Sequence, residues 1–141
     1  MTDSGFRSGS SAEQAEAIAQ NVNKKSSAEL AYGYDEEAAS MMERGLALHK
    51  QGKRELALQM LSLSRQRIRG PENPQLAALH MYSGAILFEC EAYREAISHF
   101  RSAYTILKST LGAGDPNTIV AEQQVQLTFR KLIRSSGQNR R

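Results

Sequence analysis

The sequence predicts an all-α protein, and three observations lead to this prediction. Five stretches carry apolar or small residues at the three- and four-residue spacing of an amphipathic helix. Glycine and proline interrupt the chain, above all at residues 70–74 and 112–116, and no stretch has the alternation of a half-buried strand. The pattern of one pair of stretches also recurs 39 residues later in the next pair.

The first helix is predicted to start at residues 35–37, because acidic residues suit the positive end of the helix dipole. Its apolar stripe stops at residues 51–53. A second run then continues to Gly70 and Pro71, a pair that ends helices. The remaining runs cover about 75–90, 94–111 and 117–133, and a basic tail follows at 136–141.

The first 34 residues are predicted to form an acidic arm. Residues 1–37 have a net charge of −4, whereas residues 38–141 have a net charge of +7. The Ser- and Gly-rich start indicates disorder, so we expect a largely disordered arm with one short helix at 12–22, capped by Ser11. Such an arm either folds back on the basic body or serves only to keep the protein in solution.

Length and composition suit one domain without a membrane span. The chain has 141 residues, of which 40% are apolar and 23% charged, and no apolar run approaches the roughly 18 residues of a span. The first thirty residues lack the pattern of a targeting peptide, and the single cysteine, Cys90, has no partner for an internal disulfide. We therefore expect an intracellular protein of the cytoplasm.

The two predicted hairpins share one pattern of small and bulky residues. Small residues permit the close approach of two crossing helices, and bulky residues one turn away fill the space beside the contact. Each hairpin alone buries only part of its apolar surface, so we expect the two to stack. The aligned sets are Gly45, Leu48, Ala57, Leu61 and Ser64 in the first hairpin and Gly84, Leu87, Ala96, Phe100 and Ala103 in the second.

At these residues the chain resembles the tetratricopeptide repeat family, and its linkers resemble the lengthened ones of kinesin-light-chain-type repeats. The resemblance covers residues 38 to about 135. Met41, His80 and Glu91 depart from the family pattern. The resemblance implies a short right-handed solenoid of antiparallel helix hairpins over 35–135, with two repeats and a capping helix at about 38–71, 77–111 and 117–134.

The capping helix is expected to close the row of hairpins. Gln126 stands where a small contact residue would be needed for a further partner helix. Two repeats and a cap are fewer than the roughly three repeats that usually make a solenoid stable. We therefore expect either a monomer of marginal stability or support from a partner protein, from a homodimer or from the N-terminal helix. The residues expected to pack back onto the stack are Val125, Phe129, Leu132 and Ile133.

Stacked hairpins of this type present their first helices on a concave face. Its floor is apolar with two methionines and its rim is basic, which suits an amphipathic helix or peptide that carries acidic residues. The predicted function is thus a protein-interaction module, either adaptor or assembly factor; alternatively, these side chains pack against neighbouring repeats or the arm. The proposed groove residues are Met42, Leu46, His49, Lys50, Met81, Ala85, Phe88, Gln123, Leu127 and Arg130.

Neither catalytic nor cofactor chemistry is indicated. The histidines at 49, 80 and 99 lack the spacing of metal ligands, and the chain has no nucleophile elbow or phosphate-binding glycine loop. We therefore expect no enzyme, no metal and no cofactor. The carboxylate clamp of the resembled family is also absent, because its slots hold Met42, Glu43, Leu46, Tyr82 and Gln124.

Two alternatives to groove binding stay open. The first is a fixed subunit of a larger complex, held by its convex face and tails. The second is a helical repeat associated with nucleic acid, which the basic clusters at helix ends and in the tail suggest.

Overall fold

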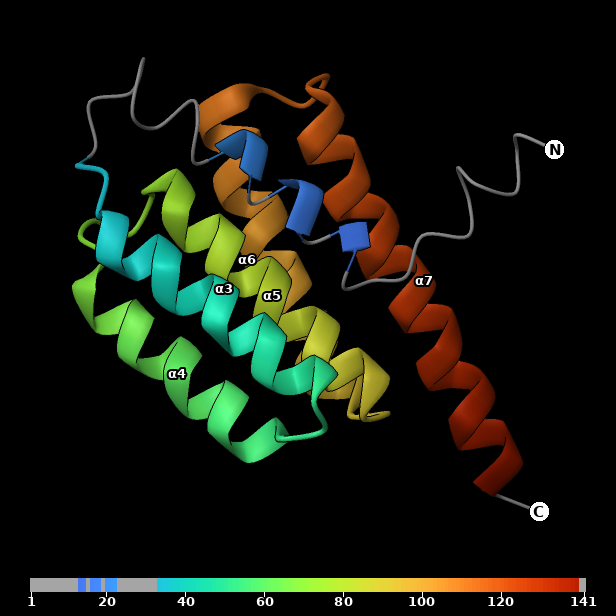
Figure 1. The fold of residues 1–141 in the computed structure, drawn as a ribbon. Helices are drawn as coiled ribbons and strands as arrows, with labels where there is room; N and C mark the ends of the chain where they lie inside the picture. The colour runs from blue at the N-terminus through green and yellow to red at the C-terminus, as the bar shows by residue number, and fades with distance from the viewer. Residues whose placement is uncertain (1–12, 15, 19, 23–32, 140–141) are drawn as a thin grey trace, which may run out of the picture.

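The computed structural model describes residues 13–14, 16–18, 20–22 and 33–139. Every regular element within them is a helix, so the all-α prediction is confirmed (Figure 1). No helix in this part of the chain is both long and apolar enough to cross a membrane. The helices with complete bounds are α3 (Glu36–Lys50), α4 (Arg54–Arg67), α5 (Pro74–Glu89), α6 (Tyr93–Leu111) and α7 (Pro116–Asn139).

Side-chain caps set the starts of α3 and α5. The Asp35 carboxylate accepts a hydrogen bond from the Ala38 N–H at 2.8 Å, which satisfies one of the free donors of the first turn of α3. Arg67 donates to the same carboxylate at 2.9 Å, and this contact lowers the pKa of Asp35. At α5, Asn73 accepts from the Gln75 N–H while proline occupies the first helical position.

The turns of the two hairpins have the same backbone structure 39 residues apart. The N–H groups of Gly52 and Lys53 donate back to carbonyl groups of α3, each at 2.9 Å. Those of Glu91 and Ala92 make the corresponding bonds to α5, also at 2.9 Å. Gly52 and Glu91 both have a positive φ, 83° and 63° respectively. The sequence repeat is therefore a repeat of structure down to the individual hydrogen bonds.

Close contacts join the two helices of each hairpin at the predicted small residues. A Cβ atom added at Gly45 would lie 3.1 Å from the Leu61 side chain and 3.3 Å from the Ala57 carbonyl oxygen. At Gly84 it would lie 2.6 Å from the Phe100 ring. At Gly84 the distance leaves no room for a Cβ atom unless the Phe100 ring moves, and at Gly45 a Cβ atom would fit only if its neighbours shifted slightly, so both crossings favour glycine.

Helix α5 lies at the centre of the fold, where it contacts α3, α4 and α6. Nearly all of its side chains are buried, and α7 packs on the far side against α6. The side-chain amide of Gln75 ties the two hairpins together: it accepts from the Asp35 N–H at 2.9 Å and donates to the Asp35 carbonyl at 3.0 Å. The pairing of this buried amide offsets the cost of removing it from water.

Helix α7 differs from the predicted cap in two ways. It continues to Asn139 and so includes residues that were expected to form the basic tail. The expectation that Phe129 and Ile133 pack back is wrong, because their side chains are 50% and 56% exposed. Only Val125 and Leu132 of that expected set are partly buried.

The reason lies in the face that α7 turns toward its neighbours. Its buried residues are small or carry amides, and they recur at intervals of one to four positions along the helix. Small side chains let α7 approach α6 closely, whereas Phe129 and Ile133 lie on a side that no described helix covers. The buried residues of α7 are Asn117, Thr118, Ala121, Gln124 and Thr128.

Candidate interaction site

The described residues 13–14, 16–18 and 20–22, which we call the N-terminal segment, are helical and lie beside the first half of α7 (Figure 1). Ile18 and Val22 are 2% and 0% exposed. Both belong to the same buried cluster as Met42 of α3 and Met81 of α5. The segment is therefore part of the packed structure. Residues 1–12 and 23–32 of the predicted acidic arm lie outside the described residues.

Two amide pairs align the N-terminal segment with α7. The Gln124 side chain donates to the Gln14 side chain at 2.5 Å, and the Asn21 side chain donates to that of Asn117 at 3.2 Å. Gln14 and Asn21 are seven residues apart, as are Asn117 and Gln124, and seven residues make about two helical turns. Because the pairing order is reversed, the segment runs antiparallel to α7.

On its other side, the N-terminal segment approaches α3 and α5. Glu16 forms an ion pair with Lys50 at the end of α3, at 3.9 Å between the charged atoms. Both side chains are well exposed, so this pair adds little stability. On α5, burial raises the pKa of Tyr82, and Glu16 and Glu43 add to the shift. The segment thus lies across α5, with α3 at one side and α7 at the other.

We call the surface beneath this segment the inner face. On α3 and α5 it consists of predicted groove residues: Met42, Leu46, Met81 and Ala85 are all buried in the same cluster as Ile18 and Val22. On α7 it consists of Asn117 and Gln124, which contact the segment directly.

The remaining predicted groove residues lie at the margin. His49 and Phe88 are partly buried, and His49 pairs with Glu89 at 2.6 Å. Lys50 is exposed, and Leu127 is 36% exposed. Gln123 and Arg130 are exposed as well, and the buried neighbour Gln124 holds the position expected for Gln123. On α7 the buried side chains are Gln124 and Thr128 instead of the predicted Gln123 and Leu127, so the predicted groove positions on this helix are wrong by one residue.

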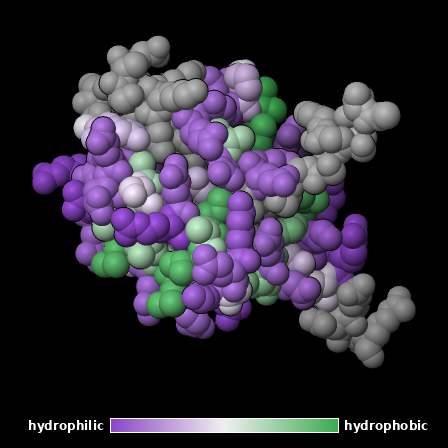
Figure 2. Space-filling model, viewed as in Figure 1, coloured by the Kyte–Doolittle hydropathy of each residue, from purple (hydrophilic) through white to green (hydrophobic). Residues whose placement is uncertain are grey.

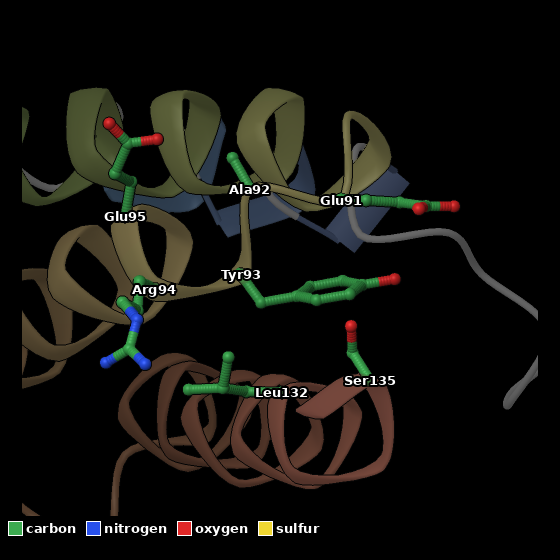
Figure 3. Close-up of a pocket in the computed structure, with 7 residues that line it drawn as sticks. All are labelled: Glu91, Ala92, Tyr93, Arg94, Glu95, Leu132 and Ser135. Atoms are coloured by element: carbon green, nitrogen blue, oxygen red, sulfur yellow. The ribbon is translucent and has the colours of Figure 1, made fainter. Parts of the chain in front are cut away.

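A second, open hollow lies between the α5–α6 turn and the C-terminal half of α7 (Figure 3). Residues 91–95 form one wall, and Leu132 and Ser135 of α7 form the other. The Tyr93 ring projects across the hollow toward Ser135, and its edge packs against Phe88 at 5.5 Å between ring centres. The contact between the two rings joins the end of α5 to the start of α6 beside the hollow.

A histidine pair fills a slot between α5 and α6. The Nδ1 atoms of His80 and His99 lie 3.0 Å apart. Burial and the proximity of His99 and Arg65 lower the pKa of His80 to about 4. Burial, followed by Arg65, also lowers the pKa of His99. At neutral pH both rings are therefore uncharged and share one hydrogen bond.

The chemistry of the inner face is that of helix packing. Ile18 and Val22 of the segment belong to one apolar cluster with side chains of α3 and α5, and the carboxamides of Asn117 and Gln124 on α7 pair with those of Asn21 and Gln14. Within the described part of the chain, no three histidine, cysteine or acidic side chains come together as metal ligands.

A scan against protein-family models, a search of curated proteins and a search of solved structures find no match for this chain.

Proposed function

We propose that this protein is a non-enzymatic interaction module of the tetratricopeptide type, and that a helix of a partner protein binds on its inner face. The observation that carries the proposal is the helical segment that already lies there, with Ile18 and Val22 inserted among apolar side chains. The resemblance at the two hairpin crossings supports the family assignment, and under that assignment the inner face would take the place of the family's concave face.

The energetics favour a site built for a short amphipathic helix. Burying one aliphatic side chain of this size contributes about 1.5–3 kcal/mol. A helix of a dozen residues is marginal by itself in water, so the helical form of the N-terminal segment depends on this burial. Any other chain that offers two such anchors at helical spacing gains the same stabilisation, which is the general logic of helix-in-groove recognition.

Photo-cross-linking tests the proposal. A benzophenone amino acid placed at Leu127, at the margin of the inner face, is expected to cross-link to a partner protein in the cells from which the chain comes. The matched control carries the benzophenone amino acid at Leu63, whose side chain is 48% exposed on α4. Cross-links from position 127 alone support the proposal, and their absence there contradicts it.

A second candidate function is favoured by the outer surface of α4. Leu56 and Leu63 are 50% and 48% exposed, and their seven-residue spacing puts them on one side of the helix. Hydrophobic residues are visible over α4 in Figure 2. This surface would suit a fixed subunit of a larger complex, and cross-links from position 63 alone would favour it over binding at the inner face.

A further inference from the structure

We propose that the N-terminal segment is an internal competitor: it occupies the site of the partner helix and is displaced by a helix of the same chemistry. That helix presents an acidic residue, a β-branched apolar residue two positions later and a second one four positions further on. The inference rests on the proposed function and adds both the ligand class and a means of regulation.

The anchors define the apolar part of this ligand. Ile18 and Val22 are four residues apart and share one side of the helix. On the opposite side, Ala17 and Gln20 are exposed. The segment therefore contacts the inner face as an amphipathic ligand does, with one stripe buried and the other in water.

The polar contacts define the direction and the register of the ligand. Asn117 and Gln124 of α7 are 8% and 3% exposed, and each pairs with a carboxamide of the segment. A buried amide favours ligands that offer it a hydrogen bond and disfavours those that do not. A competing helix is therefore expected to run antiparallel to α7, with carboxamides or similar groups seven residues apart.

The charge contact defines the acidic position. Glu16 lies two residues before the first anchor, near Lys50 on α3 and Tyr82 on α5. Because the Glu16–Lys50 pair is exposed, it contributes more to selecting an acidic helix than to holding it.

Exchange requires a competing helix to replace the contacts that hold the segment. Among these contacts are two amide pairs with α7, one long, exposed ion pair with α3 and the two apolar anchors. The segment belongs to the same chain, so its effective concentration at the site is in the millimolar range expected for a short tether. A free partner helix must compete with that concentration. The tether therefore sets the partner concentration at which the N-terminal segment is displaced.

The test uses the full chain and a fluorescent peptide with the sequence of residues 11–24. In one variant, Ile18→Asp and Val22→Asp release the segment. A matched control, Ala17→Asp and Gln20→Asp, adds the same charge on the exposed side. We expect the released variant to bind the peptide at least tenfold more tightly than the wild type and the control do. A peptide that carries Ile18→Asp is expected not to bind.

A milder variant covers the case in which the two aspartates disturb the fold. Ile18→Ala with Val22→Ala adds no charge and is expected to tighten peptide binding about threefold or more, with the helical circular dichroism signal kept. Equal peptide affinity in the wild type and the folded released variants would overturn the competitor inference and leave the proposed function standing. Tighter peptide binding without any partner cross-link at Leu127 would refute the proposed function. The N-terminal segment would then have a structural role alone.

Discussion

Replacement of Glu91 by glycine is predicted to stabilise the protein, because Glu91 holds a backbone conformation that suits glycine. Its φ is 63°, and the corresponding residue of the first hairpin is Gly52, with a φ of 83°. The Glu91 side chain is exposed and takes part in none of the ion pairs found among the described residues. The substitution therefore removes strain without the loss of a described charge contact.

The expected magnitude follows from two opposing contributions. A non-glycine residue in the left-handed region costs roughly 1–2 kcal/mol. Glycine offsets part of the gain by roughly 0.5–1 kcal/mol, because it makes the unfolded chain more flexible. The free energy of unfolding should thus rise by about 0.5–1 kcal/mol, which for a domain of this size raises Tm by roughly 2–5 °C.

Urea denaturation followed by circular dichroism measures this change. The matched control is Gly52→Ala, where a Cβ atom would meet nothing within 4 Å, so that any loss of stability comes from the backbone alone. Glu91→Gly is expected to raise the urea midpoint and Gly52→Ala to lower it by a similar amount, with unchanged m-values. If both substitutions shift the midpoint in the same direction, the structural equivalence of the two turns is refuted.

Three further predictions concern the core, a titrating pair and the end of the stack. Gly84→Ala should destabilise the protein by about 2 kcal/mol in thermal unfolding, because a Cβ atom would lie 2.6 Å from the Phe100 ring; an unchanged Tm would contradict the close crossing. The neutral form of His80 is favoured in the fold, where its pKa is about 4 rather than 6.5. The unfolded chain therefore binds the proton first as the pH falls. Stability should fall by about 3 kcal/mol between pH 6.5 and 4, and His80→Gln should flatten that part of the profile measured by urea titration. A profile that is equally steep in the variant would place the titration elsewhere. Phe129→Ser should change the free energy of unfolding by less than about 1 kcal/mol, since the side chain is 50% exposed; a loss of 3 kcal/mol would show that it is covered.

The helices and the pairing within each hairpin could be predicted from the sequence. Apolar spacing and the glycine and proline breakers place the helices of both hairpins within a few residues of their observed bounds. The recurrence of Gly45 and Ala57 at Gly84 and Ala96 indicated where helices cross, since only small residues permit that approach. These are local properties, or properties of one hairpin, and the residue types alone express them.

The candidate site was predictable only in part. The apolar positions of α3 and α5 followed from the hairpin pattern and are buried as one surface. Asn117 and Gln124 were missed as contact residues, although their buried neighbours Ala121 and Thr128 continue the same three- and four-residue spacing. Amides are common on exposed helix faces, so the spacing of small and amide residues on α7 was a weak signal without knowledge of the neighbouring helix.

The sequence by itself determined the helical class, the two equivalent hairpins and the apolar surface that they share. Only the tertiary structure decided which side of α7 meets that surface, and that the N-terminal segment covers it. The physical reason is that periodicity shows which side chains leave water, whereas the identity of the covering group depends on competition among all segments that can reach it. Ile18 and Val22 reach the inner face because the chain folds back, and that depends on contacts nearly a hundred residues apart, such as Asn21 with Asn117.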